Sequence, residues 1–217
     1  MTKIIIAGAT GLVGGELAKL LAGSTHELHI IGRRAADDLP DGNEQHIAPT
    51  EDWPALIAEI GAAVAISCLG TTMKIAGSQE AFAAVDLDLV LAFASAAKQG
   101  GARQIMAVSS TMAVADSANF YLKTKGQAEK SILNLGFDRT DFVRPGLLRG
   151  ERGGVFRAGE MIGMIVSPLT DMLLMGSLRK YRSIAARDVA RAMANLVGAQ
   201  TQGQFIHEND AILALAS

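Results

Sequence analysis

The stretch that decides the fold is Lys3–Gly15, with the sequence KIIIAGATGLVGG. Its aliphatic residues run unbroken to Ala7, which is typical of a short buried strand. Gly8 then opens a glycine-rich turn, and the leucines that follow, Leu12, Leu17, Leu20 and Leu21, lie near one face of a helix. The stretch therefore predicts a strand, a tight turn and an amphipathic helix in immediate succession.

The rest of the chain repeats this alternation of short aliphatic runs and longer helical patterns. Further strands are predicted at Glu27–Ile31, Gln45–Ala48, Ala62–Leu69, Gln104–Ser109 and Asp138–Arg144, and an edge strand in the tail that begins at Gly203. Helices are predicted at Trp53–Ile60, Gln79–Gln99, Phe120–Leu135 and Arg187–Val197. Such alternation is typical of an α/β protein with a Rossmann-type, doubly wound parallel sheet. We expect a single domain over residues 1–217, in which 147–183 form a small substrate or lid segment.

Composition excludes several classes of function. Among 217 residues, 20 Lys and Arg face 22 Asp and Glu, so the net charge of −2 gives no basic excess for nucleic acid. No apolar run is long enough to span a membrane, and the amino terminus lacks the apolar segment of a secretory signal, so we expect a cytoplasmic protein. Cys68 is the one cysteine, and the four histidines show no metal-motif spacing, so the sequence predicts no metal site.

The glycine turn is a candidate cofactor site. Gly8 permits the turn, Gly11 lets the backbone approach a pyrophosphate, and Gly14 lets the helix pack closely on the strand, while the helix N–H groups face the phosphates. The spacing is GxxGxxG rather than the commoner GxGxxG, but it has the strand–turn–helix context that this motif requires. The predicted dinucleotide contacts in this turn are Gly8, Thr10, Gly11, Leu12, Val13 and Gly14.

The end of the second predicted strand indicates which dinucleotide binds. Proteins that bind NAD usually carry an acidic residue there, whereas this chain has Arg33 and Arg34. A guanidinium binds a 2′-phosphate bidentately and stacks on adenine, so NADP(H) is the expected cofactor.

Tyr121 and Lys125 lie four residues apart, hence on one face of a predicted helix. A free phenol is a poor proton donor at neutral pH, and a nearby ammonium makes it a better one by stabilising the phenolate. Ser109, Ser110 and Thr111 end the preceding strand and offer hydroxyls that could polarise a carbonyl. We take Tyr121, Lys125 and Ser110 as candidate catalytic residues, with Thr111 as the alternative third hydroxyl.

The glycine turn, strand-end hydroxyls and YxxxK, in this order, resemble the short-chain dehydrogenase/reductase superfamily in its extended or atypical branch. More closely, the chain resembles the Tat-interacting oxidoreductase family, a group of small atypical members. The segments that carry this resemblance are GATGLVGG, IGRR, CLGTT at Cys68–Thr72, NFYLKTKGQAE at Asn119–Glu129 and FVRPGLL at Phe142–Leu148.

The resemblance implies an NADP(H)-binding Rossmann fold in which Tyr121 is the general acid or base and Lys125 holds the nicotinamide ribose. It implies further cofactor contacts at Cys68, Leu69, Gly70, Thr71, Pro145, Gly146 and Leu147. The chain departs from relatives that carry an Asp after the third strand, where it has His46–Pro49. It also has Asp86 where extended members often have Asn.

Two functions are compatible with these motifs. One is an NADP(H)-dependent oxidoreductase that transfers hydride between nicotinamide and a carbonyl or alcohol substrate. The other is an NADP(H)-binding regulatory or redox-sensor protein with little turnover. The sequence does not indicate the substrate, and it is compatible with a monomer or a homodimer.

Overall fold

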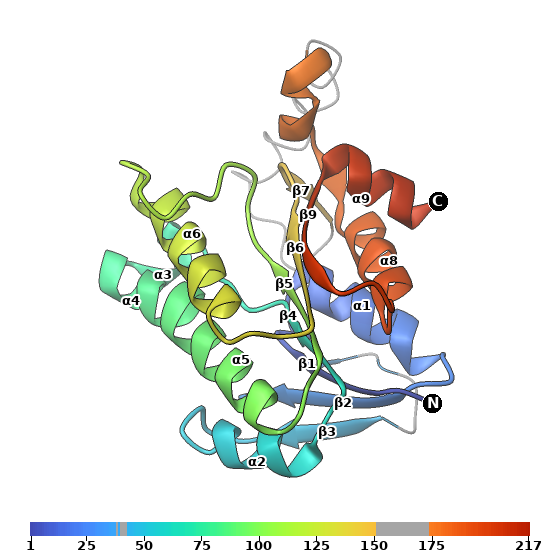
Figure 1. The fold of residues 1–217 in the computed structure, drawn as a ribbon. Helices are drawn as coiled ribbons and strands as arrows, with labels where there is room; N and C mark the ends of the chain where they lie inside the picture. The colour runs from blue at the N-terminus through green and yellow to red at the C-terminus, as the bar shows by residue number, and fades with distance from the viewer. Residues whose placement is uncertain (38, 40–42, 151–173) are drawn as a thin grey trace.

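A computed structural model describes residues 1–37, 39, 43–150 and 174–217. Its centre is a seven-stranded sheet in the order β3-β2-β1-β4-β5-β6-β9, in which every neighbouring pair is parallel (Figure 1). The strands are β1 (Lys3–Ala7), β2 (Glu27–Gly32), β3 (Glu44–Ile47), β4 (Val64–Ser67), β5 (Gln104–Val108), β6 (Arg139–Arg144) and β9 (Gly203–Glu208). From β1 the strand order runs toward one edge of the sheet through β2 and β3, and from β4 it runs toward the other edge. The order therefore reverses between β1 and β4, and a crevice is expected at the carboxyl ends of these two strands.

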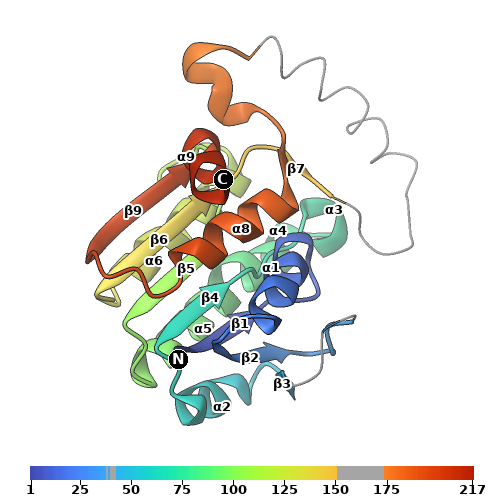
Figure 2. The ribbon, with the colours of Figure 1, turned by 90° about the vertical axis from the view of Figure 1, so that its right-hand side faces the viewer.

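Helices cover both faces of the sheet (Figures 1 and 2). Helices α1 (Leu12–Ala22) and α8 (Ala186–Leu196) pack against each other on one face, with α9 (Asn209–Ala216) beside α8. The opposite face carries α2 (Trp53–Ile60), α5 (Val90–Gln99) and α6 (Phe120–Leu133). The doubly wound α/β fold predicted from the sequence is therefore confirmed, including the edge strand in the tail.

Alternate residues of the inner strands belong to two separate cores. Ile4 and Ile6 of β1 pack with α1 and α8, whereas Ile5 and Ala7 pack with α2 and α5. Because both faces are covered, β1 and β4 at the middle of the sheet are almost wholly apolar rather than alternating with polar residues. This is why the short aliphatic runs were reliable signals of strands.

The long helix predicted over Gln79–Gln99 is present, but it is not regular. It begins as α4 (Gln79–Ala83), passes through a π-helical turn at Ala84–Leu89, and continues as α5. Phe82, Asp86 and Val90 are buried at intervals of four residues, and the wider turn keeps all three on the inner face. Such turns are frequent at functional sites, and here the turn directs a carboxylate into the protein.

The segment predicted as a substrate or lid region lies largely outside the described residues. At its two described ends, β7 (Leu148–Arg149) pairs in parallel with β8 (Ile184–Ala185), and a 3₁₀ helix, η2, spans Gly176–Tyr181. A short helix, α3 (Met73–Ala76), was not predicted. Among the described residues, no helix has the length and apolar character required to cross a membrane.

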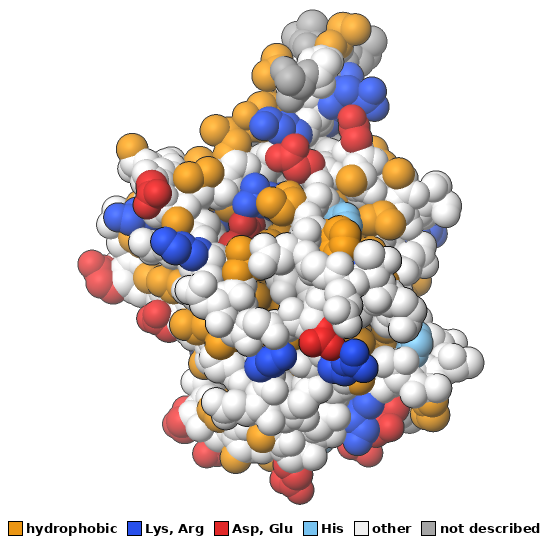
Figure 3. All heavy atoms as spheres, viewed as in Figure 1, with side chains coloured by type: hydrophobic (Ala, Val, Ile, Leu, Met, Phe, Trp, Pro, Cys, Tyr) orange, Lys and Arg blue, Asp and Glu red, His pale blue; other side chains and the backbone are white. Residues whose placement is uncertain are grey.

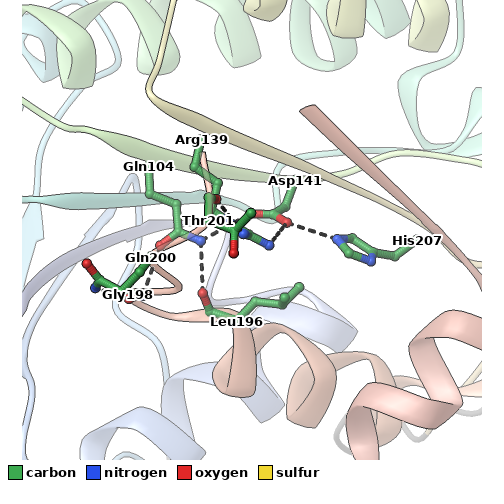
Figure 4. A network of polar contacts seen from close by, with 8 residues as sticks. All are labelled: Gln104, Arg139, Asp141, Leu196, Gly198, Gln200, Thr201 and His207. Atoms are coloured by element: carbon green, nitrogen blue, oxygen red, sulfur yellow. Dashed lines mark hydrogen bonds and ion pairs between the residues drawn. The ribbon is translucent and has the colours of Figure 1, made fainter. Parts of the chain in front are cut away.

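A buried polar network joins β5, β6 and β9 to the end of α8 (Figure 4). Both oxygens of the fully buried Asp141 accept hydrogen bonds from Arg139, at 2.7 and 2.8 Å. The Gln104 amide donates to Asp141 and to the carbonyl of Leu196, and His207 Nε2 lies 2.9 Å from Asp141 Oδ1. Burial alone would raise the pKa of Asp141, but the hydrogen bonds from His207 and Arg139 outweigh it and lower the pKa.

This network predicts a pH-dependent stability difference. Asp141→Asn leaves the buried Arg139 without its counter-charge and should lower the free energy of unfolding by about 3 kcal/mol at pH 7. Because the folded-state pKa is depressed, the contribution is complete above the ordinary Asp pKa of about 3.9 and is lost as the pH falls further. Urea unfolding should therefore give the same difference at pH 7 and pH 5, and a smaller one below pH 4.

The matched control is Asp138→Asn. Asp138 pairs with an Arg103 side chain that is 73% exposed, so this substitution should cost less than about 1 kcal/mol. Equal costs for the two variants would show that the buried network does not hold these strands together.

Candidate functional site

A cavity of about 310 Å³ opens where the carboxyl ends of β1, β2 and β4 meet. It is lined by the turn after β1, by the end of β2 and the two arginines that follow it, and by the loop after β4. Of the predicted cofactor contacts, this cavity brings together Gly8, Thr10, Gly11, Arg33, Arg34, Cys68, Leu69, Gly70 and Thr71. Trp53, Ile75, Val85 and Leu89 also line it, and sequence reasoning did not single them out.

Two glycines make this turn possible. Gly8 has φ +91°, and a Cβ there would lie 2.5 Å from the backbone of Cys68. A Cβ on Gly14 would lie 2.2 Å from the carbonyl oxygen of Gly8. The turn, the first helix and the end of β4 are therefore in contact through backbone atoms, and no side chain fits between them.

The start of α1 is suited to an anion. Its N-cap residue, Gly11, provides no side-chain cap, and the first turn contains no acidic residue. The first N–H groups of a helix lack partners within the helix and carry partial positive charge, so a phosphate is a favourable partner for them. Of the other predicted contacts in this helix, Val13 and Gly14 are buried, and Leu12 borders a neighbouring hollow instead.

Positive charge at the cavity is local. Arg33 and Arg34 are exposed and line its rim. On the face drawn in Figure 3, the described Lys and Arg side chains are mixed with Asp and Glu rather than gathered in one patch. The two arginines and the helix terminus are therefore the groups that favour an anionic ligand in this cavity.

Cys68 is half-buried beside the glycine turn. Burial raises the pKa of its thiol to about 12, so it stays neutral at physiological pH. A neutral thiol is a poor nucleophile and a poor metal ligand. Cys68 therefore acts as a small packing residue at the wall of the cavity.

A buried ion pair lies next to this cavity. Lys125 Nζ is 2.8 Å from Asp86 Oδ1, and the two side chains are 8% and 0% exposed. Asp86 Oδ2 accepts a hydrogen bond from the Thr71 N–H at 2.8 Å, and a Cβ on Gly70 would lie 3.3 Å from Asp86 Oδ1. Gly70 and Thr71 therefore line the cavity on one side and touch the ion pair on the other.

A buried ion pair of this kind is weak evidence for stability, because removing two charges from water costs about as much as their attraction returns. Its position beside a ligand cavity is instead typical of a functional site. Sequence reasoning noted Asp86 only as a departure from relatives. An acidic residue on the inner face of an alanine-rich helix was the signal that could have identified it.

Tyr121 is the second residue of α6 and is half-buried. Its ring packs on Phe82, with 5.5 Å between ring centres, and neither Tyr121 nor Lys125 lines the cavity itself. Helix α6 is tied to β6 beneath it, because Arg144 Nε donates to Glu129 at 2.8 Å and a second guanidinium nitrogen also bonds this carboxylate. The pair raises the pKa of Arg144 through that hydrogen bond. This bond fixes the helix that carries both candidate catalytic residues.

The hydroxyls after β5 differ in their bonding. Ser110 Oγ donates to the carbonyl of Thr111 at 3.2 Å. Ser109 Oγ and Thr111 Oγ1 are buried and have no hydrogen-bond partner among the described residues. Buried hydroxyls without partners are uncommon, so this observation favours Thr111 over Ser110, whose hydroxyl already has a partner.

The last predicted contacts, Pro145, Gly146 and Leu147, form the loop after β6. The Gly146 N–H donates to Asn209 at 2.7 Å, and a Cβ on Gly146 would lie 2.3 Å from the Arg182 carbonyl oxygen. This loop is thereby fixed to the carboxyl-terminal part of the chain, and like Tyr121 it lies outside the cavity lining.

The sequence matches the model of the NAD dependent epimerase/dehydratase family over residues 4–132. The chain therefore belongs to this family, and the predicted resemblance to extended short-chain dehydrogenases/reductases is confirmed. Among curated relatives, the mitochondrial protein FMP52 of Candida albicans is 32% identical over 207 residues, which cover 92% of this chain and 90% of that protein. The FMP52 protein of Coccidioides immitis is 33% identical and covers 94% of this chain and 91% of its own length.

Solved structures share the fold at low identity. The Bordetella bronchiseptica enzyme WbmH, in complex with NAD+, has a TM-score of 0.73 at 15% identity and covers 96% of this chain and 76% of its own. The human epimerase family protein SDR39U1, with NADPH, has a TM-score of 0.63 at 17% identity and covers 94% of this chain and 72% of its own. These structures show that the chain shares their fold, and one was solved with NAD+ and the other with NADPH.

The prediction of a cytoplasmic location is wrong, because the relatives above are named as mitochondrial proteins. The argument from the sequence considered only the apolar segment of a secretory signal. Mitochondrial targeting segments are amphipathic and arginine-rich, so the lack of an apolar segment does not separate these locations.

The close packing of α6 on the loop around Val114 can be tested at Gly126. A Cβ on Gly126 in α6 would lie 2.2 Å from the backbone carbon of Val114, in the loop that follows the strand-end hydroxyls. Gly126→Ala should therefore lower the free energy of unfolding by at least about 2 kcal/mol, although alanine favours helices. Gly23→Ala is the control, since its Cβ would have 4.0 Å of clearance at φ −84°. Equal urea midpoints for the two variants would contradict the close packing of α6 on this loop.

Proposed function

We propose that this protein is an NADP(H)-dependent oxidoreductase that interconverts a carbonyl compound and the corresponding alcohol. The observation that carries the proposal is the contact through Gly70 and Thr71, which joins the anion-binding cavity to the buried Lys125–Asp86 pair. A cofactor cavity and a proton-transfer group must lie side by side for this chemistry. The family membership and the NADPH-bound and NAD-bound neighbours agree with a nicotinamide dinucleotide.

The residues present fit such a cofactor. The bare start of α1 and the Gly8–Gly11 turn would hold the pyrophosphate, and Arg33 and Arg34 would hold the 2′-phosphate. When bound, the nicotinamide supplies or accepts the hydride. Because the cavity is open and sized for part of a dinucleotide, the remainder would extend along Thr71 toward Lys125.

The proton would move through α6. In the reductive direction Tyr121 donates its phenolic proton to the carbonyl oxygen, and a hydroxyl of Ser110 or Thr111 donates a hydrogen bond to the same oxygen. Lys125 stabilises the resulting phenolate with its positive charge. Asp86 acts as a positioning residue, because it fixes the Lys125 ammonium and at the same time holds the Thr71 backbone of the cavity.

The cofactor preference is tested by titrating the full-length protein with NADPH and NADH by calorimetry. We expect NADPH to bind at least tenfold more tightly, a difference of about 1.4 kcal/mol. Arg33→Ala/Arg34→Ala should remove this preference, because the 2′-phosphate contact is lost, whereas NADH loses only stacking on its adenine and should weaken much less than NADPH. Arg103→Ala, an exposed arginine at the amino end of β5, is the control. Equal affinities in the wild type would contradict the assignment of NADP(H).

The catalytic assignment is tested with Tyr121→Phe on a panel of aldehydes and ketones, following NADPH oxidation. Loss of the proton donor should lower kcat by about a hundredfold or more, while the dissociation constant for NADPH stays within threefold. Unchanged turnover would remove Tyr121 from the mechanism. Bound NADPH without turnover of any compound would favour the regulatory alternative.

The proposed role of Asp86, which is to position Lys125, can be tested in the same assay. Asp86→Asn keeps an acceptor for the Thr71 N–H but removes the charge opposite Lys125, so kcat should fall by about tenfold with little change in KM. Asp88→Asn is the matched control, because Asp88 is an exposed residue of the same π-helical turn. Equal effects of the two substitutions would show that Asp86 does not position Lys125.

A further inference from the structure

A second cluster of chemically active side chains lies on β2 and β3, outside the lining of the candidate cofactor cavity. The register pairs His29 with Glu44 and Ile31 with His46, so His29, Glu44 and His46 all project from the same face of the sheet. His29 Nδ1 is 3.0 Å from His46 Nε2 and 3.2 Å from Glu44 Oε2, and the last two atoms are 3.8 Å apart. Two imidazoles and one carboxylate therefore direct three ligand atoms at one point.

The dimensions of this triangle suit a small divalent metal ion. Metal–ligand distances of about 2.0–2.1 Å in a tetrahedral site place neighbouring ligand atoms about 3.3 Å apart. The three observed separations average close to that value. His29 and His46 with one carboxylate form a donor set that suits Zn²⁺ and similar first-row ions.

Glu27 adds a second observation that points to a cation. His29 Nε2 lies 2.9 Å from Glu27 Oε1, so one side of the ring is held by a carboxylate. On the other side, His29 Nδ1 forms a hydrogen bond with His46 Nε2 at 3.0 Å and lies 3.2 Å from Glu44 Oε2. A cation at the centre would replace that hydrogen bond with bonds to all three atoms, and a carboxylate behind the ring is the usual support of a metal-binding histidine.

Two carboxylates give the cluster negative charge, and one side of it is open to solvent. Glu44 belongs to the cluster, and Glu27, which lies behind His29, also pairs with Lys3 at 3.1 Å. The Glu44 side chain is 70% exposed whereas that of His29 is 6% exposed, so a preformed buried ligand meets a carboxylate that is open to solvent. Solvent can fill the remaining coordination position.

We propose that His29 Nδ1, His46 Nε2 and Glu44 Oε2 bind one divalent transition-metal ion of the Zn²⁺ type. The ion fastens the edge strand β3 to β2. Strand β2 leads directly into Arg33, and the Ala48 N–H after β3 donates to the Gly32 carbonyl at 3.1 Å. Metal binding therefore stabilises the part of the sheet that carries the two arginines, independently of the proposed oxidoreductase activity.

The test is calorimetric titration of the tag-free, full-length protein with Zn²⁺ after removal of metals by a chelator. We expect one ion per chain. His46→Gln and Glu44→Gln should each weaken the dissociation constant at least tenfold, because each removes one of three ligands. His26→Gln is the matched control, a histidine outside the cluster, and should change the constant less than twofold.

Folding is checked separately from binding. Glu44 is exposed, so Glu44→Gln should unfold at the same temperature as the wild type when the chelator is present, and it should lose the rise in that temperature that Zn²⁺ gives the wild type. A proton on His29 Nδ1 would satisfy the triangle as a metal ion does, and that alternative predicts no Zn²⁺ binding. Absence of one-to-one binding, or binding unchanged in both cluster variants, overturns the proposal.

Discussion

Backbone contact between the turn after β1 and the end of β4 is the constraint on which the rest of the carboxyl edge depends. Gly8 touches Cys68, and the Cys68 N–H donates to the Ala7 carbonyl at 2.8 Å. Gly14 in α1 packs equally closely on this turn, because a side chain there would collide with the Gly8 carbonyl. The helix can start beside the crevice only because these positions lack a Cβ, and its uncapped N–H groups are then the surface that we propose for the pyrophosphate.

The ion pair of Lys125 and Asp86 lies between this edge of the sheet and the helix that carries Tyr121. It joins the π-helical turn, helix α6 and the loop after β4, which come from distant parts of the sequence. Two buried charges in contact add little to stability, but they hold one ammonium in one place. Such a fixed charge is what a tyrosine acid needs if it is to act at neutral pH.

Strands and most helices could be predicted because periodicity is a local property. The Lys3–Ala7 strand and the Trp53–Ile60 helix have the predicted boundaries, and the glycine turn and Arg33 with Arg34 lie around one cavity. The π-helical turn could not be predicted, because it accompanies a contact of Asp86 with Lys125, which belongs to a different helix, α6. The His29–His46 contact was missed for the same kind of reason: 17 residues separate them, and only the register of two strands brings them to 3.0 Å.

The most direct test of the central claim, that one edge of the sheet holds both the dinucleotide and the proton donor, is a crystal structure of the protein with NADPH. The account predicts the pyrophosphate at the start of α1, the 2′-phosphate against Arg33 and Arg34, and the nicotinamide within reach of Tyr121 and Lys125. A nucleotide bound elsewhere, or a nicotinamide turned away from Tyr121, would contradict it.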